Sequence, residues 1–241
     1  MERRVRRMNL KKLVTAAVCT MLMAAVAFTG GCGGEKKSDK KVLKVGMECA
    51  YAPYNWSQTK ADGGAVKIAG SNEYAYGYDV MMAKKLADSM GADLEIHKIE
   101  WDGLAPAVVS GKIDAAIAGM SITSKRKETV DFTKPYYYAT VVALVKKDSE
   151  QAKAQSVADL KGSVATSQLN TIWYDQIDQV PDVKKLPAID TVPGMIVALT
   201  SGKCNLIVTD IPTAKAAAFA NPELTVLNFE EEKGFKTSRE D

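Results

Sequence analysis

The sequence predicts an α/β protein of two lobes, each with a mainly parallel sheet flanked by helices. Between residues 42 and 229, strand-like apolar runs alternate with segments of helical periodicity. Two distant segments, 104–119 (LAPAVVSGKIDAAIAG) and 195–210 (MIVALTSGKCNLIVTD), share Ala-x-x-Ser-Gly-Lys and the same order of helix, glycine and strand. This internal repetition indicates two lobes of similar plan. The composition, 46% hydrophobic and 25% charged over 241 residues, is that of a globular protein.

In the first lobe, aspartates that can cap helices and glycines that can end them set the expected bounds of the helices. Asp79 supports the start of a helix that Gly91 ends, and Asp102 can cap a second helix that closes at Gly111. The polar, glycine-containing stretch after Tyr54 shows no period and is expected to be a loop. The expected elements are a strand at 42–47, a loop at 55–75, a helix at 78–90, a strand at 94–99, a helix at 102–110 and a strand at 113–118.

The second lobe begins with a long apolar strand, and the alternation of strands and helices then restarts. The expected elements are strands at 140–145, 163–166, 183–186, 206–209 and 224–229, and helices at 157–160, 170–179, 192–201 and 213–220.

The N-terminus predicts export. Six basic residues precede an apolar run at 13–28, which is short for a membrane span and typical of a signal peptide over residues 1–31. Thr29, Gly30 and Gly31 before Cys32 resemble a bacterial lipoprotein processing site, which predicts a lipidated Cys32, a flexible tether at 32–41 and an extracytoplasmic, membrane-anchored protein. The alternative is ordinary secretory cleavage near Gly31, with Cys32 incidental.

Charge and cysteine content exclude several classes. The net charge of +3 becomes −2 without the first 31 residues, which leaves 26 Lys and Arg against 28 Asp and Glu, so no nucleic-acid partner is expected. Cys49 and Cys204 match no metal-binding spacing and fall in different lobes, so we expect two free thiols. With a single histidine, His97, no metal site is expected, and nothing in the sequence calls for a cofactor.

Chemistry-bearing residues follow the expected strands, where open α/β sheets bind their ligands. Arg126 offers a planar fork to a carboxylate, and free backbone N–H groups near Thr171 add to it. Asp210 offers a carboxylate to an ammonium, and Ser121 can bridge the two. The pattern predicts a receptor for an amino-acid zwitterion. The candidate binding residues are Glu48, Tyr51, Tyr54, Trp101, Gly119, Ser121, Arg126, Asn170, Thr171 and Asp210.

Plainer interpretations stay open. Arg126 between two lysines is also typical of a solvated helix start, and Asp210 of a helix N-cap. Tyr136, Tyr137 and Tyr138 are expected to pack between lobes or lie at the surface, and are left out of the site.

The ligand side chain is expected to meet two rings. Tyr51 and Trp101 would flank it, and Glu48 would meet a positive tip, which favours a basic amino acid. Glutamine or an apolar amino acid remains the alternative, as does pairing of Glu48 with a lysine.

Several motifs identify a family. The segment Ser121-Ile122-Thr123, Arg126 and 130–136 (VDFTKPY) closely resembles the signature of the polar amino-acid family of extracellular solute-binding proteins, which feed ABC importers. The resemblance runs from about Val42 to the end. It includes Tyr51-Ala52-Pro53-Tyr54, Gly77-Tyr78-Asp79, Trp101-Asp102-Gly103-Leu104 and Asp159-Leu160-Lys161-Gly162.

The resemblance implies a two-lobed fold like that of periplasmic binding proteins. Lobe one would span 42–140, lobe two would span 141–228, and a return crossing to lobe one would start at 229–241. Two extended hinge crossings would join the lobes. It implies that Arg126 holds the ligand carboxylate, that Ser121 and Gly119 contact the ligand backbone, and that Asp210 holds the ammonium. Gly119 replaces the family's serine or threonine. The sequence stops where family members return to lobe one, so we expect the C-terminal part of the fold to be missing.

The implied protein is a monomer that delivers a free amino acid to a membrane permease and has no catalytic residue. Two rivals remain. One is an enzyme on the same fold, resembling a cyclohexadienyl dehydratase, for which Glu48 is the only spare general acid or base. The other is the ligand-sensing domain of a receptor.

Overall fold

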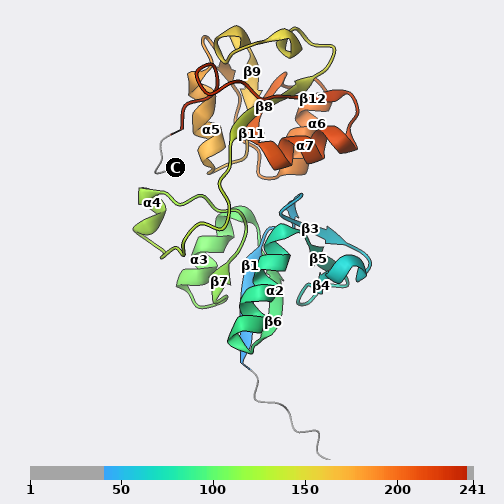
Figure 1. The fold of residues 1–241 in the computed structure, drawn as a ribbon, viewed down its shortest axis with the longest axis vertical. Helices are drawn as coiled ribbons and strands as arrows, with labels where there is room; N and C mark the ends of the chain where they lie inside the picture. Colours follow the sequence, from blue (N-terminus) through green and yellow to red (C-terminus); the bar gives the residue numbers. More distant parts are fainter. Residues whose placement is uncertain (1–40, 238–241) are drawn as a thin grey trace, which may run out of the picture. The chain divides into compact units, whose positions relative to one another are not determined.

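The computed structural model describes residues 41–237, which form three sheets with their helices (Figure 1). The predicted signal peptide, Cys32 and all of the tether except Lys41 lie outside the described residues, as do the last four residues. Among residues 41–237, no helix is both long and apolar enough for a membrane crossing.

The first sheet is parallel throughout, with strand order β6-β1-β7. Helix α2 packs on β6, and helix α3 lies against β1 and β7. Val45 and Met47 of the central strand are fully buried against Val80 and Ala83 of α2. The elements are β1 (Val42–Met47), α2 (Tyr78–Met90), β6 (Asp93–Lys98), the 3₁₀ helix η2 (Trp101–Gly103), α3 (Leu104–Val109) and β7 (Ala115–Ala116).

A second, antiparallel sheet occupies the segment expected to be a loop at 55–75, so that prediction was wrong. Its order is β2-β3-β5-β4, and Trp56 pairs with Tyr76 across two strands, with ring centroids 5.0 Å apart. Such cross-strand ring pairs stabilise strands too short to show periodicity. The elements are β2 (Ala50–Tyr51), β3 (Asn55–Gln58), the 3₁₀ helix η1 (Asp62–Gly64), β4 (Val66–Lys67) and β5 (Tyr74–Tyr76). With the first sheet they make up the first lobe.

The second lobe holds a five-stranded sheet of order β10-β9-β11-β8-β12. Strands β10, β9 and β11 are parallel, but β8 runs antiparallel to both β11 and β12, so this sheet is mixed. Its strands are β8 (Val141–Lys146), β9 (Val164–Thr166), β10 (Lys184–Lys185), β11 (Leu206–Asp210) and β12 (Leu224–Leu227). Its helices are η3 (Glu150–Lys153), η4 (Ala158–Leu160), α5 (Ile172–Gln176), η5 (Ile177–Gln179), α6 (Val192–Thr200) and α7 (Ile211–Ala220).

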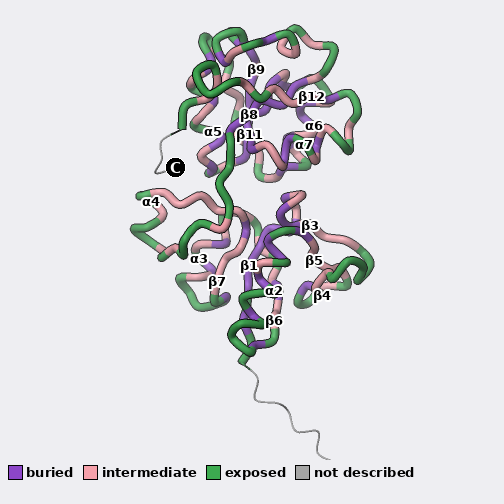
Figure 2. The backbone as a smooth tube through the Cα atoms, viewed as in Figure 1, coloured by how far each residue is buried: buried purple, intermediate pink, exposed green. Residues whose placement is uncertain are grey.

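Both faces of this sheet are covered. Along β8, Val142 and Leu144 pack with α6 and α7, whereas Val141, Ala143 and Val145 pack with α5 on the opposite face. This period of two follows from the pleat of a strand. Figure 2 accordingly shows β8 and β11 among the buried segments.

The internal repetition appears as two helix–strand units, α3 with β7 and α6 with β11. In each, a glycine with positive φ follows the helix: Gly111 at +71° and Gly202 at +78°. The copies differ in their strands, because β7 is shorter than the predicted 113–118 and lies at a sheet edge. The predicted cap by Asp102 is wrong, since Gly103 precedes α3 without a side-chain hydrogen bond.

Candidate functional site

Arg126 lies in the short helix α4 (Ser124–Lys127), which begins after Thr123. The Thr123 hydroxyl accepts a hydrogen bond from the Arg126 backbone N–H at 3.2 Å, as an N-cap does. The guanidinium donates to the Ser121 carbonyl at 2.7 Å and, from the first lobe to the second, to the Asn170 carbonyl at 2.8 Å. It also lies over the Trp101 ring, 5.5 Å from its centroid. Burial lowers the pKa of Arg126, but a guanidinium stays charged.

Asp210 ends β11 and is fully buried. It caps α7, because one carboxylate oxygen accepts from the Thr213 N–H at 2.9 Å. The other oxygen accepts from the Thr213 hydroxyl at 2.9 Å and from the Tyr51 hydroxyl of the first lobe at 2.6 Å. Tyr54 adds a longer bond of 3.4 Å. The plainer interpretation of Asp210 as a helix cap therefore holds, and the same carboxylate also faces the other lobe.

Glu48 follows β1 and has an exposed fraction of 3%. One carboxylate oxygen accepts from the Gln168 side-chain amide of the second lobe at 3.0 Å, and the other has no hydrogen-bond partner. Burial raises the pKa of Glu48 to about 7, although the bond from Gln168 opposes the rise. Gln168 also donates to the Asp190 carbonyl at 3.0 Å. Gln168 was not predicted, yet it follows β9, where the strand-end rule would have found it.

Asn170 and Thr171 form the turn before α5. Asn170 has a φ of +53°, and its carbonyl accepts from Arg126 and, at 3.4 Å, from the Trp101 indole. Its side-chain amide donates to the Asp102 carboxylate at 2.9 Å. Asp102, which was expected to cap a helix, therefore bonds to Asn170 instead. The Thr171 hydroxyl donates to the Gln168 carbonyl at 2.7 Å.

A small cavity of about 10 Å³ lies among these groups. Six predicted site residues line it: Tyr51, Trp101, Gly119, Ser121, Arg126 and Thr171. Gln168 and Trp173 complete the lining, whereas four predicted site residues do not line this cavity: Glu48, Tyr54, Asn170 and Asp210. A volume of this size holds about one water molecule. An amino acid therefore enters only if residues of the two lobes move apart.

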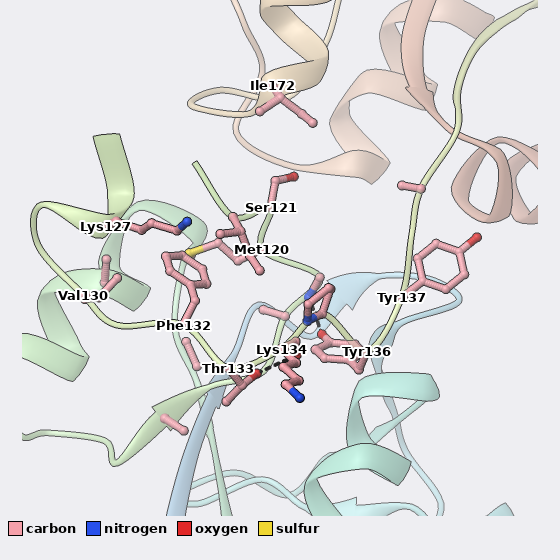
Figure 3. A pocket seen from close by; sticks show the side chains of 18 of the residues that line it. Met120, Ser121, Lys127, Val130, Phe132, Thr133, Lys134, Tyr136, Tyr137 and Ile172 are labelled. Carbon is pink, nitrogen blue, oxygen red and sulfur yellow. Dashed lines mark hydrogen bonds between the residues drawn. The ribbon is translucent and has the colours of Figure 1, made fainter. Parts of the chain in front are cut away.

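A larger cavity of about 700 Å³ adjoins the small one and shares Tyr51, Gly119, Ser121 and Trp173 with it. Figure 3 shows the side chains of Met120, Val130, Phe132 and Tyr136 around it. Its wall includes the edge strand β7 and four charged residues, but Arg126 and Asp210 do not line it. The charged residues are Asp114, Lys127, Asp131 and Lys134.

Tyr136, which was left out of the predicted site, connects this wall to the binding residues. Its hydroxyl accepts from the Gly119 N–H at 3.0 Å and donates to Asp79 at 2.7 Å (Figure 3 includes Tyr136). Asp79 is fully buried, and its other oxygen accepts from the Asn55 amide at 2.7 Å. Burial raises the pKa of Asp79 to about 6, although both hydrogen bonds oppose the rise. Tyr136 thus fixes the backbone at Gly119.

Residues 41–237 contain neither a candidate metal site nor a disulfide. In that range no cluster of three or more His, Cys, Asp or Glu side chains could hold a metal ion. Cys49 and Cys204 are both buried and form no disulfide with each other in the described residues.

Two α/β lobes line one cavity. One contributes the half-buried Arg126, and the other contributes the buried Asp210, which accepts a hydrogen bond from the cavity residue Tyr51. This arrangement defines a solute-binding protein of the two-lobed type. The model of the family described as bacterial extracellular solute-binding proteins, family 3, matches residues 43–185. The chain belongs to this family.

Curated relatives are named as amino-acid-binding proteins. A "Probable histidine-binding protein" of Campylobacter jejuni is 30% identical over 227 residues, which cover 89% of this chain and 80% of the relative. "ABC transporter arginine-binding protein 1" of Escherichia coli is 29% identical over 218 residues, which cover 90% and 78%.

Solved structures agree with this fold. The arginine-bound form of a truncated ArgBP from T. maritima superposes with a TM-score of 0.65 at 28% identity, covering 82% of this chain and 84% of that one. An ancestral arginine-binding protein bound to glutamine gives a TM-score of 0.68 at 30% identity, covering 82% of each chain.

Proposed function

We propose that this chain is the substrate-binding component of an amino-acid ABC importer, which binds a polar, preferably basic, amino acid between its lobes and delivers it to the membrane permease. One observation carries the proposal. A half-buried guanidinium, Arg126, and a buried carboxylate, Asp210, each make a hydrogen bond across the lobes beside one shared cavity. A zwitterion requires one group of each charge.

The ligand would replace contacts that the lobes now make with each other. Its carboxylate would take the place of the Asn170 carbonyl on Arg126 and gain a charge-assisted pair. Its ammonium would take the place of the Tyr51 hydroxyl on Asp210. Both exchanges trade a neutral partner for a charged one. The proposed binding residues are the ten predicted from the sequence, together with Gln168.

A basic side chain fits Glu48. This carboxylate is buried, and one of its oxygens has no partner, so a cationic tip would satisfy it and lower its pKa from about 7. The names of the two relatives point the same way. A neutral amide is the second candidate, because a structural neighbour has glutamine bound and because Gln168 can pair with an amide as well as with an acid.

We propose no catalysis. The named relatives are binding proteins. Among the described residues, Glu48 is the one buried acid with an unpartnered carboxylate oxygen, so it is the group that an enzyme would have to use as its general acid or base. A dehydratase would convert its substrate, so incubation of the chain with candidate amino acids and cyclic acids should yield no product by mass spectrometry. Turnover would favour the enzyme.

The family is extracellular, and lipid anchoring at Cys32 is part of the proposal for this chain. The anchor would keep a monomeric receptor close to its permease after removal of residues 1–31. Metabolic labelling with a fatty acid should mark the parent and not Cys32→Ser; equal labelling of the two proteins would exclude an anchor at Cys32.

A thermal-shift screen of the chain against the common amino acids tests the function. A ligand that binds only the folded state at about 100 times its Kd stabilises by about 2.7 kcal/mol. We expect arginine, lysine or histidine to raise the melting temperature most. A screen in which none of the amino acids changes the melting temperature would rule the function out.

A further inference from the structure

Tyr51 belongs to the first lobe, but its side chain is packed in the core of the second. It is 7% exposed and shares a buried cluster with Val142, Met195 and Ile207. Its ring stacks on Tyr54 at 4.7 Å between centroids. Its hydroxyl donates to Asp210 at 2.6 Å, which is the short distance of a bond to a charged acceptor.

Gly119 makes this position of the Tyr51 ring possible. A Cβ atom at residue 119 would lie 2.9 Å from the Tyr51 Cε1, closer than carbon atoms approach in proteins. Residue 119 also has a φ of +61°, which favours glycine. The serine or threonine that the family signature has here would therefore push the ring away from its present place.

We propose that Tyr51 is an internal occupant of the ammonium site, admitted by Gly119, which holds the unliganded chain closed and competes with the ligand for Asp210. We call the Tyr51–Asp210 contact the latch. This inference rests on the proposed function for the identity of the competing group, but not for the closed state itself. The small cavity fits the inference, because its 10 Å³ leaves no room for an amino acid while Tyr51 stays in place.

Opening exchanges hydrogen bonds without any covalent step. The Tyr51 hydroxyl leaves Asp210 with its proton, and an ammonium supplies charged N–H donors to the same oxygen. Asp210 keeps its two bonds from Thr213 throughout, so the carboxylate stays oriented while the partner changes.

The first test removes the hydroxyl and keeps the ring. Tyr51→Phe should increase the radius of gyration of the unliganded chain in small-angle scattering, and should tighten L-arginine binding about tenfold in calorimetry, since a bond to a charged group no longer competes. Tyr174→Phe is the control, because its hydroxyl donates to the Leu186 carbonyl within the second lobe at 2.8 Å and lies outside the proposed site; it should change affinity less than about twofold. Unchanged unliganded scattering of Tyr51→Phe, or weaker arginine binding, would overturn the latch.

The second test uses the glycine. Gly119→Ala should open the unliganded chain as Tyr51→Phe does. Gly111→Ala is its control, since Gly111 has a similar φ of +71° but open space around its Cβ position. Placing Gly119→Ala in a Tyr51→Ala background removes the clash and should abolish the effect of the added methyl group. If Gly119→Ala and Gly111→Ala give the same scattering without ligand, Gly119 has no role in admitting Tyr51.

The two readouts separate this inference from the proposed function. Scattering without ligand reports the latch alone, and titration of the parent with L-arginine, L-lysine, L-histidine and L-glutamine reports amino-acid binding alone. If none of the four binds and Tyr51→Phe still opens the chain, the function fails and the closed-state latch stands. If they bind and Tyr51→Phe does not open the chain, the latch fails.

Discussion

The Arg126 guanidinium donates to the Asn170 carbonyl at 2.8 Å, which joins α4 of the first lobe to the turn before α5 of the second. The Trp101 indole shares that carbonyl at 3.4 Å and lies beneath the guanidinium. A backbone carbonyl thus occupies the place that we propose for the ligand carboxylate. Because a carboxylate is a stronger partner for arginine than a carbonyl is, the ligand can replace this contact.

Arg126→Ala should abolish most ligand affinity. A buried carboxylate left without its partner costs about 3–5 kcal/mol, which corresponds to a loss of L-arginine affinity of about a hundredfold to several thousandfold. Arg126→Lys should rescue poorly, because an ammonium lacks the planar fork. Lys125→Ala, at the exposed neighbouring residue, is the control and should bind like the parent. Calorimetry that finds parental affinity in Arg126→Ala would show the site to be wrongly placed.

Asp210→Asn should weaken amino-acid binding strongly while the fold persists. The asparagine keeps an oxygen for the Thr213 N–H and so can still cap α7, but it loses the charge that holds an ammonium. Scattering with saturating L-arginine should show the variant remaining more open than the parent. A liganded variant as compact and as tightly bound as the parent would contradict the assignment of the ammonium to Asp210.

Glu48→Gln should discriminate among ligands. If the ligand carries a positive tip, the variant should lose far more affinity for arginine or lysine than for glutamine, because only the cationic ligands lose an ion pair. Glu231→Gln, at an exposed residue, serves as the control. Competition titrations measure the ratio of the affinities. A parent that binds glutamine tightly and ignores arginine and lysine would exclude the basic ligand.

Glu48 should also make the free energy of unfolding depend on pH. Its pKa is raised from 4.5 to about 7 in the folded chain, so the contribution to stability is full below pH 4.5 and is lost as the pH rises through 7. The loss amounts to about 3 kcal/mol. Urea unfolding at pH 5 and pH 8 should therefore show a smaller fall in stability for Glu48→Gln than for the parent. The same fall in both proteins would refute a raised pKa at Glu48.

Tyr136→Phe should destabilise the fold by about 1–3 kcal/mol, because the buried Asp79 loses a donor. The loss should be larger above pH 6, where Asp79 is charged. Tyr138→Phe is the control, since Tyr138 is 83% exposed. Urea denaturation curves measure both variants. If the two change stability equally, the bond from Tyr136 to Asp79 contributes nothing.

Elements with strong local signals could be predicted from the sequence. Helix α2 has the predicted bounds, because its apolar residues repeat at helical spacing and Gly91 takes the left-handed conformation that ends it. The antiparallel sheet at 50–76 could not be predicted from the sequence, because its strands are two to four residues long and depend on pairing between distant residues such as Trp56 and Tyr76.

The site likewise contains residues that the sequence could predict and residues that it could not. The rule that ligands bind at strand ends predicted Arg126 and Asp210 as one site. Arg126 lines the small cavity, and Asp210 is joined to the cavity residue Tyr51 by a hydrogen bond. Tyr136 could not be assigned a role, since its partner Asp79 lies far away in sequence and only the folded chain joins them. The engagement of Asp210 by Tyr51 likewise depends on packing between lobes, which no local pattern encodes.

The central claim is that Arg126 and Asp210 together hold an amino-acid zwitterion. Calorimetric titration of the chain with L-arginine and with agmatine tests it most directly, because agmatine keeps the guanidinium and the amine but lacks the carboxylate. The account predicts that L-arginine binds and that agmatine binds about a hundredfold to several thousandfold more weakly, the same range of loss as in Arg126→Ala. Equal affinity for the two compounds would contradict the account.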